Sequence, residues 1–141
     1  MSTFIERLRA ELIARVTGLP GTTDDPLESR GQQPHENTLP RVWVWIDSDE
    51  VTQRAKPDDG EDPSRVTEYH SVSFSVGVMA KNSTAAAVVD ALVGEIRERM
   101  FPRFEGADFL FQRVEYEDEV RTYARPFVSA AVEYTITYVT P

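Results

Sequence analysis

The sequence predicts an α+β fold, with helices packed on one face of a mainly antiparallel sheet of four or five strands. Three observations lead to this class. A strand pattern from Tyr69 to Ala80 runs directly into an amphipathic helix pattern from Ser83 to Met100. Two further strand patterns follow, from Asp108 to Glu117 and from Arg125 to Thr140. A second helical pattern begins at Thr3, and such an order of elements is typical of one small α+β domain.

The composition fits a single domain covering residues 1–141. A chain of 141 residues, 40% of them hydrophobic, is long enough to bury one core without disulfides. It contains no cysteine, so disulfides and thiolate metal sites are excluded, which fits folding inside a cell. The net charge of −9 argues against wrapping duplex nucleic acid, because that function requires a concentrated basic surface. No apolar stretch has the length of a membrane span, and charges interrupt the first apolar stretch, unlike a signal peptide.

An opening helix is predicted from the first residues. Thr3 and Glu6 have the spacing of a capping box, in which each side chain bonds the backbone amide of the other residue. The residues that follow place one apolar stripe at Ile5, Leu8, Leu12 and Val16. Gly18 and Pro20 end the helix, and residues 19–39, rich in Gly, Pro, Thr, Asp and Gln, predict an irregular connector. The stripe predicts that this helix packs on the sheet.

The strand predicted from Arg41 to Asp47 is apolar on both faces. Aliphatic residues on one face alternate with Trp43 and Trp45 on the other. Such a strand lies either between two layers of its own fold or against another copy of the chain. The tryptophan pair is therefore a candidate contact with a partner, and burial under the connector 19–39 is an equal alternative.

A second irregular segment is predicted at residues 48–65. It is acidic, it lacks an apolar period, and it contains Pro57, Gly60 and Pro63. Such a segment cannot bury enough apolar area to offset the entropy of ordering, so we expect a mobile hairpin tip that is available for interaction. Its candidate contact residues are Asp49, Glu50, Arg54, Lys56, Asp58, Asp59, Glu61 and Asp62.

The strand and helix at residues 69–100 are clearly amphipathic. Valines and Phe74 share one face of the strand, while serines and Gly77 share the other. Asn82 or Ser83 is expected to cap the helix. The helix should cover the sheet with Ala85, Val88, Val89, Leu92, Ile96 and Met100.

The last two strand patterns differ in quality. The first is predicted to break into an acidic turn at residues 115–119. The second is long and regular, with Glu133, Thr135 and Thr137 on its polar face. Its length predicts that part of it continues past the edge of its own sheet and offers backbone groups for pairing.

No arrangement of residues indicates catalysis or a cofactor. His35 and His70 lie far apart in the sequence, with no second histidine at metal-ligand spacing. Carboxylate pairs such as Asp58 and Asp59 lie in segments expected to be irregular, whereas acid–base catalysis requires fixed geometry. We therefore expect no enzymatic activity, no cofactor and no metal site, and we assign the function to surface and assembly.

The order and texture of the elements carry a family resemblance over nearly the whole chain. A short opening helix is followed by Leu39-Pro-Arg-Val-Trp-Val-Trp-Ile and by the acidic segment. Then come a strand of the type Tyr-His-Ser-Val-Ser-Phe-Ser-Val-Gly-Val, the turn Lys81-Asn-Ser-Thr-Ala-Ala into a helix, and a final Val-Glu-Tyr-Thr-Ile-Thr-Tyr. Together these features resemble the tail terminator proteins (minor tail protein U-like) of long-tailed phages and related particles, including gene transfer agents.

This resemblance implies a structural virion protein of the tail neck region, assembled in the host cytoplasm. It implies a homo-oligomer, a hexameric ring, that sits on the tail tube protein, ends tube polymerisation and joins the tube to the head–tail connector protein. DNA can pass through such a ring without specific nucleic-acid binding, and no membrane is involved. Segment 48–65 would contact the tube or face the lumen. The expected subunit contacts, chosen from the strand patterns, are Trp43, Trp45, Glu133, Thr135 and Thr137.

Two alternatives belong to other classes. A head–tail connector or tail-completion protein of the neck would bind the head connector but would not cap free tubes. An unrelated α+β ligand-binding module would remain a monomer and would have a concave apolar pocket.

Overall fold

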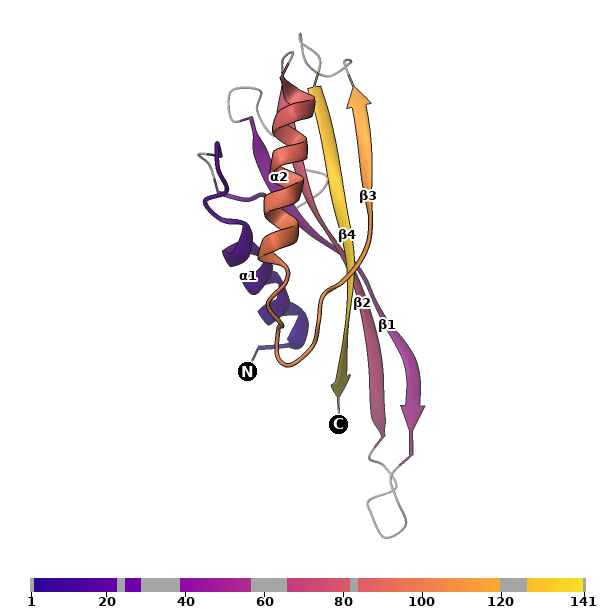
Figure 1. Cartoon of the computed structure of the whole chain (residues 1–141). Coiled ribbons are helices and arrows are strands. Elements are labelled where there is room, and N and C mark those ends of the chain that lie inside the picture. Colours follow the sequence, from indigo (N-terminus) through magenta and orange to yellow (C-terminus); the bar gives the residue numbers. More distant parts are fainter. Residues whose placement is uncertain are drawn as a thin grey trace.

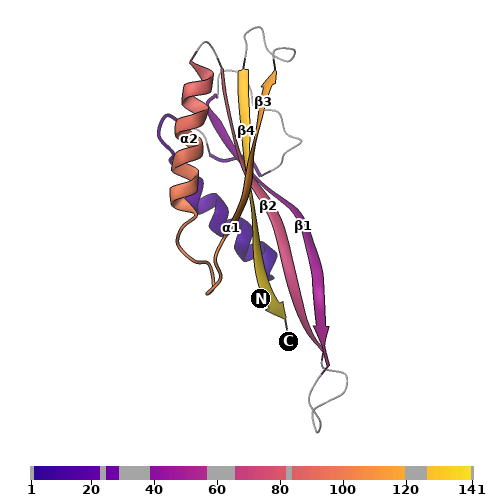
Figure 2. The same cartoon turned by 45° about the vertical axis from the view of Figure 1, so that its right-hand side comes forward.

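Four antiparallel strands form one sheet, and both helices lie on the same face of it (Figure 1; Figure 2). The computed structural model describes residues 2–22, 25–28, 39–56, 66–81, 84–119 and 127–140. Its elements are α1 (Phe4–Val16), β1 (Arg41–Ala55), β2 (Thr67–Lys81), α2 (Ala85–Arg99), β3 (Leu110–Glu119) and β4 (Phe127–Thr140). The strand order in the sheet is β1-β2-β4-β3. The predicted α+β class is confirmed.

The core lies between the helices and the inner strands. The capping box of Thr3 and Glu6 is present at the start of α1. The predicted stripes of both helices are buried or partly buried, and they pack on alternating residues of the sheet. The sheet contributes Val42, Val44, Val72, Phe74, Val76, Val78, Ala130, Val132, Tyr134 and Ile136. We call this side of the sheet the helix-facing side and the opposite side the outer face.

The C-terminal ends of α1 and α2 are capped by each other's arginines. Arg99 Nη1 donates to the carbonyls of Arg15 and Thr17, both at 3.0 Å. In return, Arg15 donates to the carbonyls of Arg99, Pro102 and Arg103, at 3.3, 2.6 and 3.1 Å. Guanidinium groups suit this position because the last carbonyls of a helix have no partner within the helix.

The strands β1 and β2 continue past the helices as a projecting ribbon, and the end of β4 pairs with the first part of it, next to α1 (Figure 1). We call residues 49–55, 67–71 and 137–140 the distal ribbon. The predicted irregular segment 48–65 is therefore wrong over residues 48–55, which form the second half of β1 and pair with β2 down to Ala55 and Thr67. This half of β1 is mostly exposed, so backbone pairing holds it without the apolar alternation of a buried strand.

The edge strand β3 corrects a second expectation. Residues 115–119 do not form an acidic turn, because β3 continues to Glu119 and pairs with β4 throughout this stretch. The strand β4 lies inside the sheet and pairs with β2 along its whole length. Its pairing with β3 stops at Thr135, so in the described part of the chain residues 136–140 pair on one side only. The predicted caps Asn82 and Ser83 lie outside the described residues.

Candidate assembly site

The five predicted subunit contacts lie together on the outer face of the sheet. Their neighbours along β1 and β4, such as Val44 and Val132, are buried under the helices, and side chains alternate along a strand. The strand β2 connects the two groups, since Ser75 pairs with both Trp45 and Glu133. The remaining contacts on this face are Trp43, Thr135 and Thr137.

Trp43 packs on its own sheet. Its ring lies over Gly77, where a Cβ atom would be 1.9 Å from Cε2 of the indole, so only glycine fits beneath it. Both tryptophans are half-buried in the single chain and do not form a fully exposed patch. Within the described residues, the indole Nε1 of Trp43 and the hydroxyl of the fully buried Ser75 have no hydrogen-bond partner.

The connector between α1 and β1 covers part of the β1 edge. Leu27 pairs with β1 beside Trp43: its amide donates to the carbonyl of Val42, and its carbonyl accepts from the amide of Val44, both at 2.8 Å. Leu27 itself is buried. The connector therefore satisfies the β1 backbone at this point.

The polar contacts on β4 are engaged with β3. Arg113 forms an ion pair and hydrogen bond with Glu133, which raises the pKa of the Arg113 guanidinium, and Glu115 adds to this effect. Gln112 Nε2 donates to the hydroxyl of Thr135 at 3.2 Å. Thr137 is exposed. The middle of the outer face, along β2, carries serines and a glycine with no charge, although the chain has a net charge of −9.

The predicted tube contacts are divided between β1 and the segment that follows it. Asp49, Glu50 and Arg54 are in β1, and Lys56 is an exposed residue directly after it. Arg54 pairs with Glu68 of β2 at 2.9 Å. The other four predicted contacts, Asp58, Asp59, Glu61 and Asp62, lie outside the described residues.

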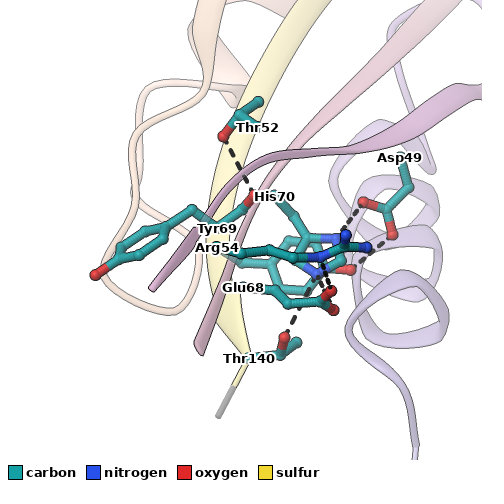
Figure 3. A network of polar contacts seen from close by, with 8 residues as sticks. Asp49, Thr52, Arg54, Glu68, Tyr69, His70 and Thr140 are labelled. Atoms are coloured by element: carbon teal, nitrogen blue, oxygen red, sulfur yellow. Dashed lines mark hydrogen bonds and ion pairs between the residues drawn. The ribbon is translucent and has the colours of Figure 1, made fainter. Parts of the chain in front are cut away.

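A polar network on the helix-facing side of the distal ribbon was not predicted (Figure 3). Asp49 accepts a hydrogen bond from the hydroxyl of Tyr138 at 2.6 Å and contacts Nδ1 of His70 at 2.9 Å. Burial raises the pKa of the Tyr138 hydroxyl, and the hydrogen bond to Asp49 raises it further. One signal was available in the sequence: His70 and Tyr138 have the same alternation as the core residues of β2 and β4.

Both edge strands carry exposed apolar side chains. On β3, Leu110 and Tyr116 are 52% and 57% exposed. On the distal half of β1, Val51 is 41% exposed. Tyr69 and Val139 form an exposed cross-strand pair on the distal ribbon between them. Scattered apolar residues are normal on a surface, but Val51, Leu110 and Tyr116 lie along the two sheet edges, where backbone groups can also be paired.

Comparison with models of known protein families gave no match, and a search among curated proteins gave none either. Within the described ranges, no group of three or more histidine or acidic side chains is arranged to hold a metal ion. None of the helices described is long and apolar enough to cross a membrane.

Proposed function

We propose that this chain is a structural subunit that assembles head to tail into a ring and caps the tail tube of a phage or phage-like particle. The observation that carries this proposal is the pair of dissimilar sheet edges with exposed apolar side chains, Val51 on β1 and Leu110 and Tyr116 on β3. A contact between two different surfaces of one chain generates a ring when the rotation between copies closes.

The strand directions are compatible with such a contact. The edge strands β1 and β3 run in opposite directions, because each of the three strand pairs is antiparallel. A copy rotated about an axis parallel to the strands therefore places its β1 antiparallel to β3 of the preceding copy. Leu27 covers the β1 edge at Val42–Val44, so the part of this edge that no described residue pairs with is its distal half. The neighbours would be staggered along the strands, as in closed sheets with tilted strands.

The terminator role within this assembly rests on the resemblance of the sequence, and the fold supports it in two ways. With both helices on the other face, the outer face carries no charged side chain along β2, where Trp43 packs over Gly77. The long β1–β2 ribbon projects beyond the body of the subunit, and residues 57–65, between these two strands, include four of the predicted tube contacts. A projecting ribbon of this kind is suited to contact a stacked ring.

Cysteine cross-linking tests the head-to-tail contact cleanly, because the chain has no cysteine of its own. Val51 and Tyr116 both lie on the helix-facing side of the sheet, since Val51 pairs with His70 and Tyr116 pairs with Ala130. We expect Val51→Cys and Tyr116→Cys proteins, mixed at high salt, to form cross-linked heterodimers that neither variant forms alone. The doubly substituted chain should give a ladder that ends at the ring. High salt favours closure because every subunit adds a charge of −9. Phe101→Cys is the matched control, since Phe101 is 75% exposed but lies outside both edge strands.

Three results would each contradict a different part of the proposal. A strict monomer in native mass spectrometry at high concentration and high salt would exclude ring formation altogether. Rings that cross-link through identical positions, Val51→Cys to Val51→Cys, would exclude the head-to-tail contact. The terminator role is tested separately. When the protein is added to the polymerising tail tube protein of the same particle, tube growth should stop, as measured by light scattering and by tube length. Tubes that grow unchanged would exclude that role.

A further inference from the structure

The distal ribbon holds a largely buried histidine whose two ring nitrogens both face oxygen atoms (Figure 3). His70 Nδ1 lies 2.9 Å from Oδ1 of Asp49. On the other side of the ring, Nε2 lies 3.4 Å from the hydroxyl of Thr140 and 3.6 Å from Oε1 of Glu68. The His70 side chain is 12% exposed, so these groups, more than bulk water, surround it.

An aromatic stack fixes the plane of this imidazole. Tyr138 stacks on His70, with ring centroids 4.4 Å apart, and on Phe4 of α1, with centroids 4.0 Å apart. The Tyr138 hydroxyl donates to Oδ2 of Asp49, so one carboxylate receives both the tyrosine and the histidine. The cluster thus joins three strands of the ribbon to the first residue of α1.

The two charge states of His70 require different partners for Nε2. In the neutral ring, Nδ1 donates to Asp49 and Nε2 is an acceptor, and the Thr140 hydroxyl is the neighbouring group that can donate to it. In the protonated ring, Nε2 is a donor and the carboxylate of Glu68 becomes the stronger partner. The charged and titratable groups around the ring are Asp49, Tyr138 and Glu68 with its partner Arg54, while α1 contributes the uncharged ring of Phe4.

We propose that His70 is the proton-sensitive element of a clasp that fixes the distal ribbon to α1. Protonation transfers Nε2 from Thr140, at the end of β4, to Glu68 of β2, which Arg54 of β1 already holds at 2.9 Å. When His70 is charged, it binds the carboxylates of Asp49 and Glu68 and so links β1 to β2, and the end of β4 loses its bond to Nε2. When His70 is neutral, Nε2 accepts from Thr140 and holds the end of β4 in place. This device is independent of ring formation and acts where the end of β4 meets β2 and α1.

The neutral state makes a direct prediction for the native chain. Nitrogen-15 NMR of the imidazole rings, at a pH of about 8, should show His70 with its proton on Nδ1, because Asp49 accepts there. His35 is the internal reference, since it is the only other histidine. A proton on Nε2 of neutral His70 would overturn the proposal, because Nε2 would then donate in both charge states.

The transfer itself is tested by lowering the pH from about 8 to about 5, the range in which histidine side chains change charge. Backbone amide signals of residues 138–140 should follow the His70 ring in one transition, and their amides should exchange faster with solvent at the low end. The same shifts should remain in His35→Gln and vanish in His70→Gln. If His70→Gln fails to fold, Thr140→Val serves instead: the ring should still titrate without the shift at residue 140. Residues 138–140 that titrate in His70→Gln, or stay constant in the native chain, would refute the clasp.

Discussion

The packing of Trp43 on Gly77 makes a substitution at Gly77 sharply informative. Gly77→Ala adds one methyl group that would lie 1.9 Å from the indole carbons, so the Trp43 ring must leave its place on the sheet. A fully buried tryptophan covers roughly 150–250 Å². If the displaced ring exposes about 100 Å², the loss at about 25 cal/mol per Å² is about 2.5 kcal/mol. Alanine regains about 0.5–1 kcal/mol over glycine within a strand, which leaves a net loss of about 1.5–2 kcal/mol.

The assay combines urea denaturation with tryptophan fluorescence. In a Trp45→Phe background Trp43 is the sole tryptophan, and Gly77→Ala should shift its emission to longer wavelength and increase its quenching by iodide. A double-mutant cycle gives the decisive sign. In a Trp43→Ala background the alanine at 77 meets no ring, so it should stabilise the protein by about 0.5–1 kcal/mol. Equal destabilisation in both backgrounds would refute the assignment of the clash to Trp43.

Three further predictions concern core, surface and pH. Ile96→Ala should cost about 2–5 kcal/mol in urea denaturation, because Ile96 is fully buried, whereas Glu98→Ala on the exposed side of α2 should change stability by less than about 0.5 kcal/mol. Thr135 is the cross-strand partner of Leu110 on the β3 edge, so Thr135→Arg should leave the circular dichroism spectrum unchanged yet abolish rings in native mass spectrometry, because a charge beside an apolar contact is costly to bury. Rings that persist would exclude the outer side of the β3 edge from the contact. Burial and Asp49 raise the pKa of Tyr138, so its stabilising contribution is present below the unfolded value of about 10 and is lost as the pH rises above it. Tyr138→Phe should therefore lose less stability than the native chain between about pH 9 and 11, measured by urea denaturation at each pH.

The helices and the strand segments that pack against them could be predicted from the sequence. For the strand segments away from the helices, the sequence did not predict where each strand ends. The α1 and α2 stripes and the inner rows of β2 and β4 follow the spacing that burial on one side imposes. The second half of β1 and residues 115–117 of β3 lie at sheet edges with mostly exposed side chains, so no apolar alternation marks them. Their strand state depends on pairing with a neighbour, which a local pattern does not reveal.

The same distinction, between what a local pattern predicts and what strand pairing decides, applies to the candidate assembly site and to the His70 cluster. The alternation of side chains alone predicted that Trp43 and Trp45 share one face of β1, and that Glu133, Thr135 and Thr137 share one face of β4. The contacts that define the His70 cluster depend instead on strand register, since Asp49 and Tyr138 are 89 positions apart in the chain. Two bulges in β1, between Ile46 and Ser48 and between Val51 and Gln53, also shift that register. No local pattern predicts such shifts.

The exchange of caps between Arg15 and Arg99 has a consequence for how the molecule opens. Each arginine sits in the last turn of one helix and holds the carbonyls that end the other. Neither helix end can fray without withdrawing the guanidinium that closes its partner. The last turns of α1 and α2 should therefore exchange their amide hydrogens as one cooperative unit, with a common opening free energy, although they are more than 80 positions apart in the chain.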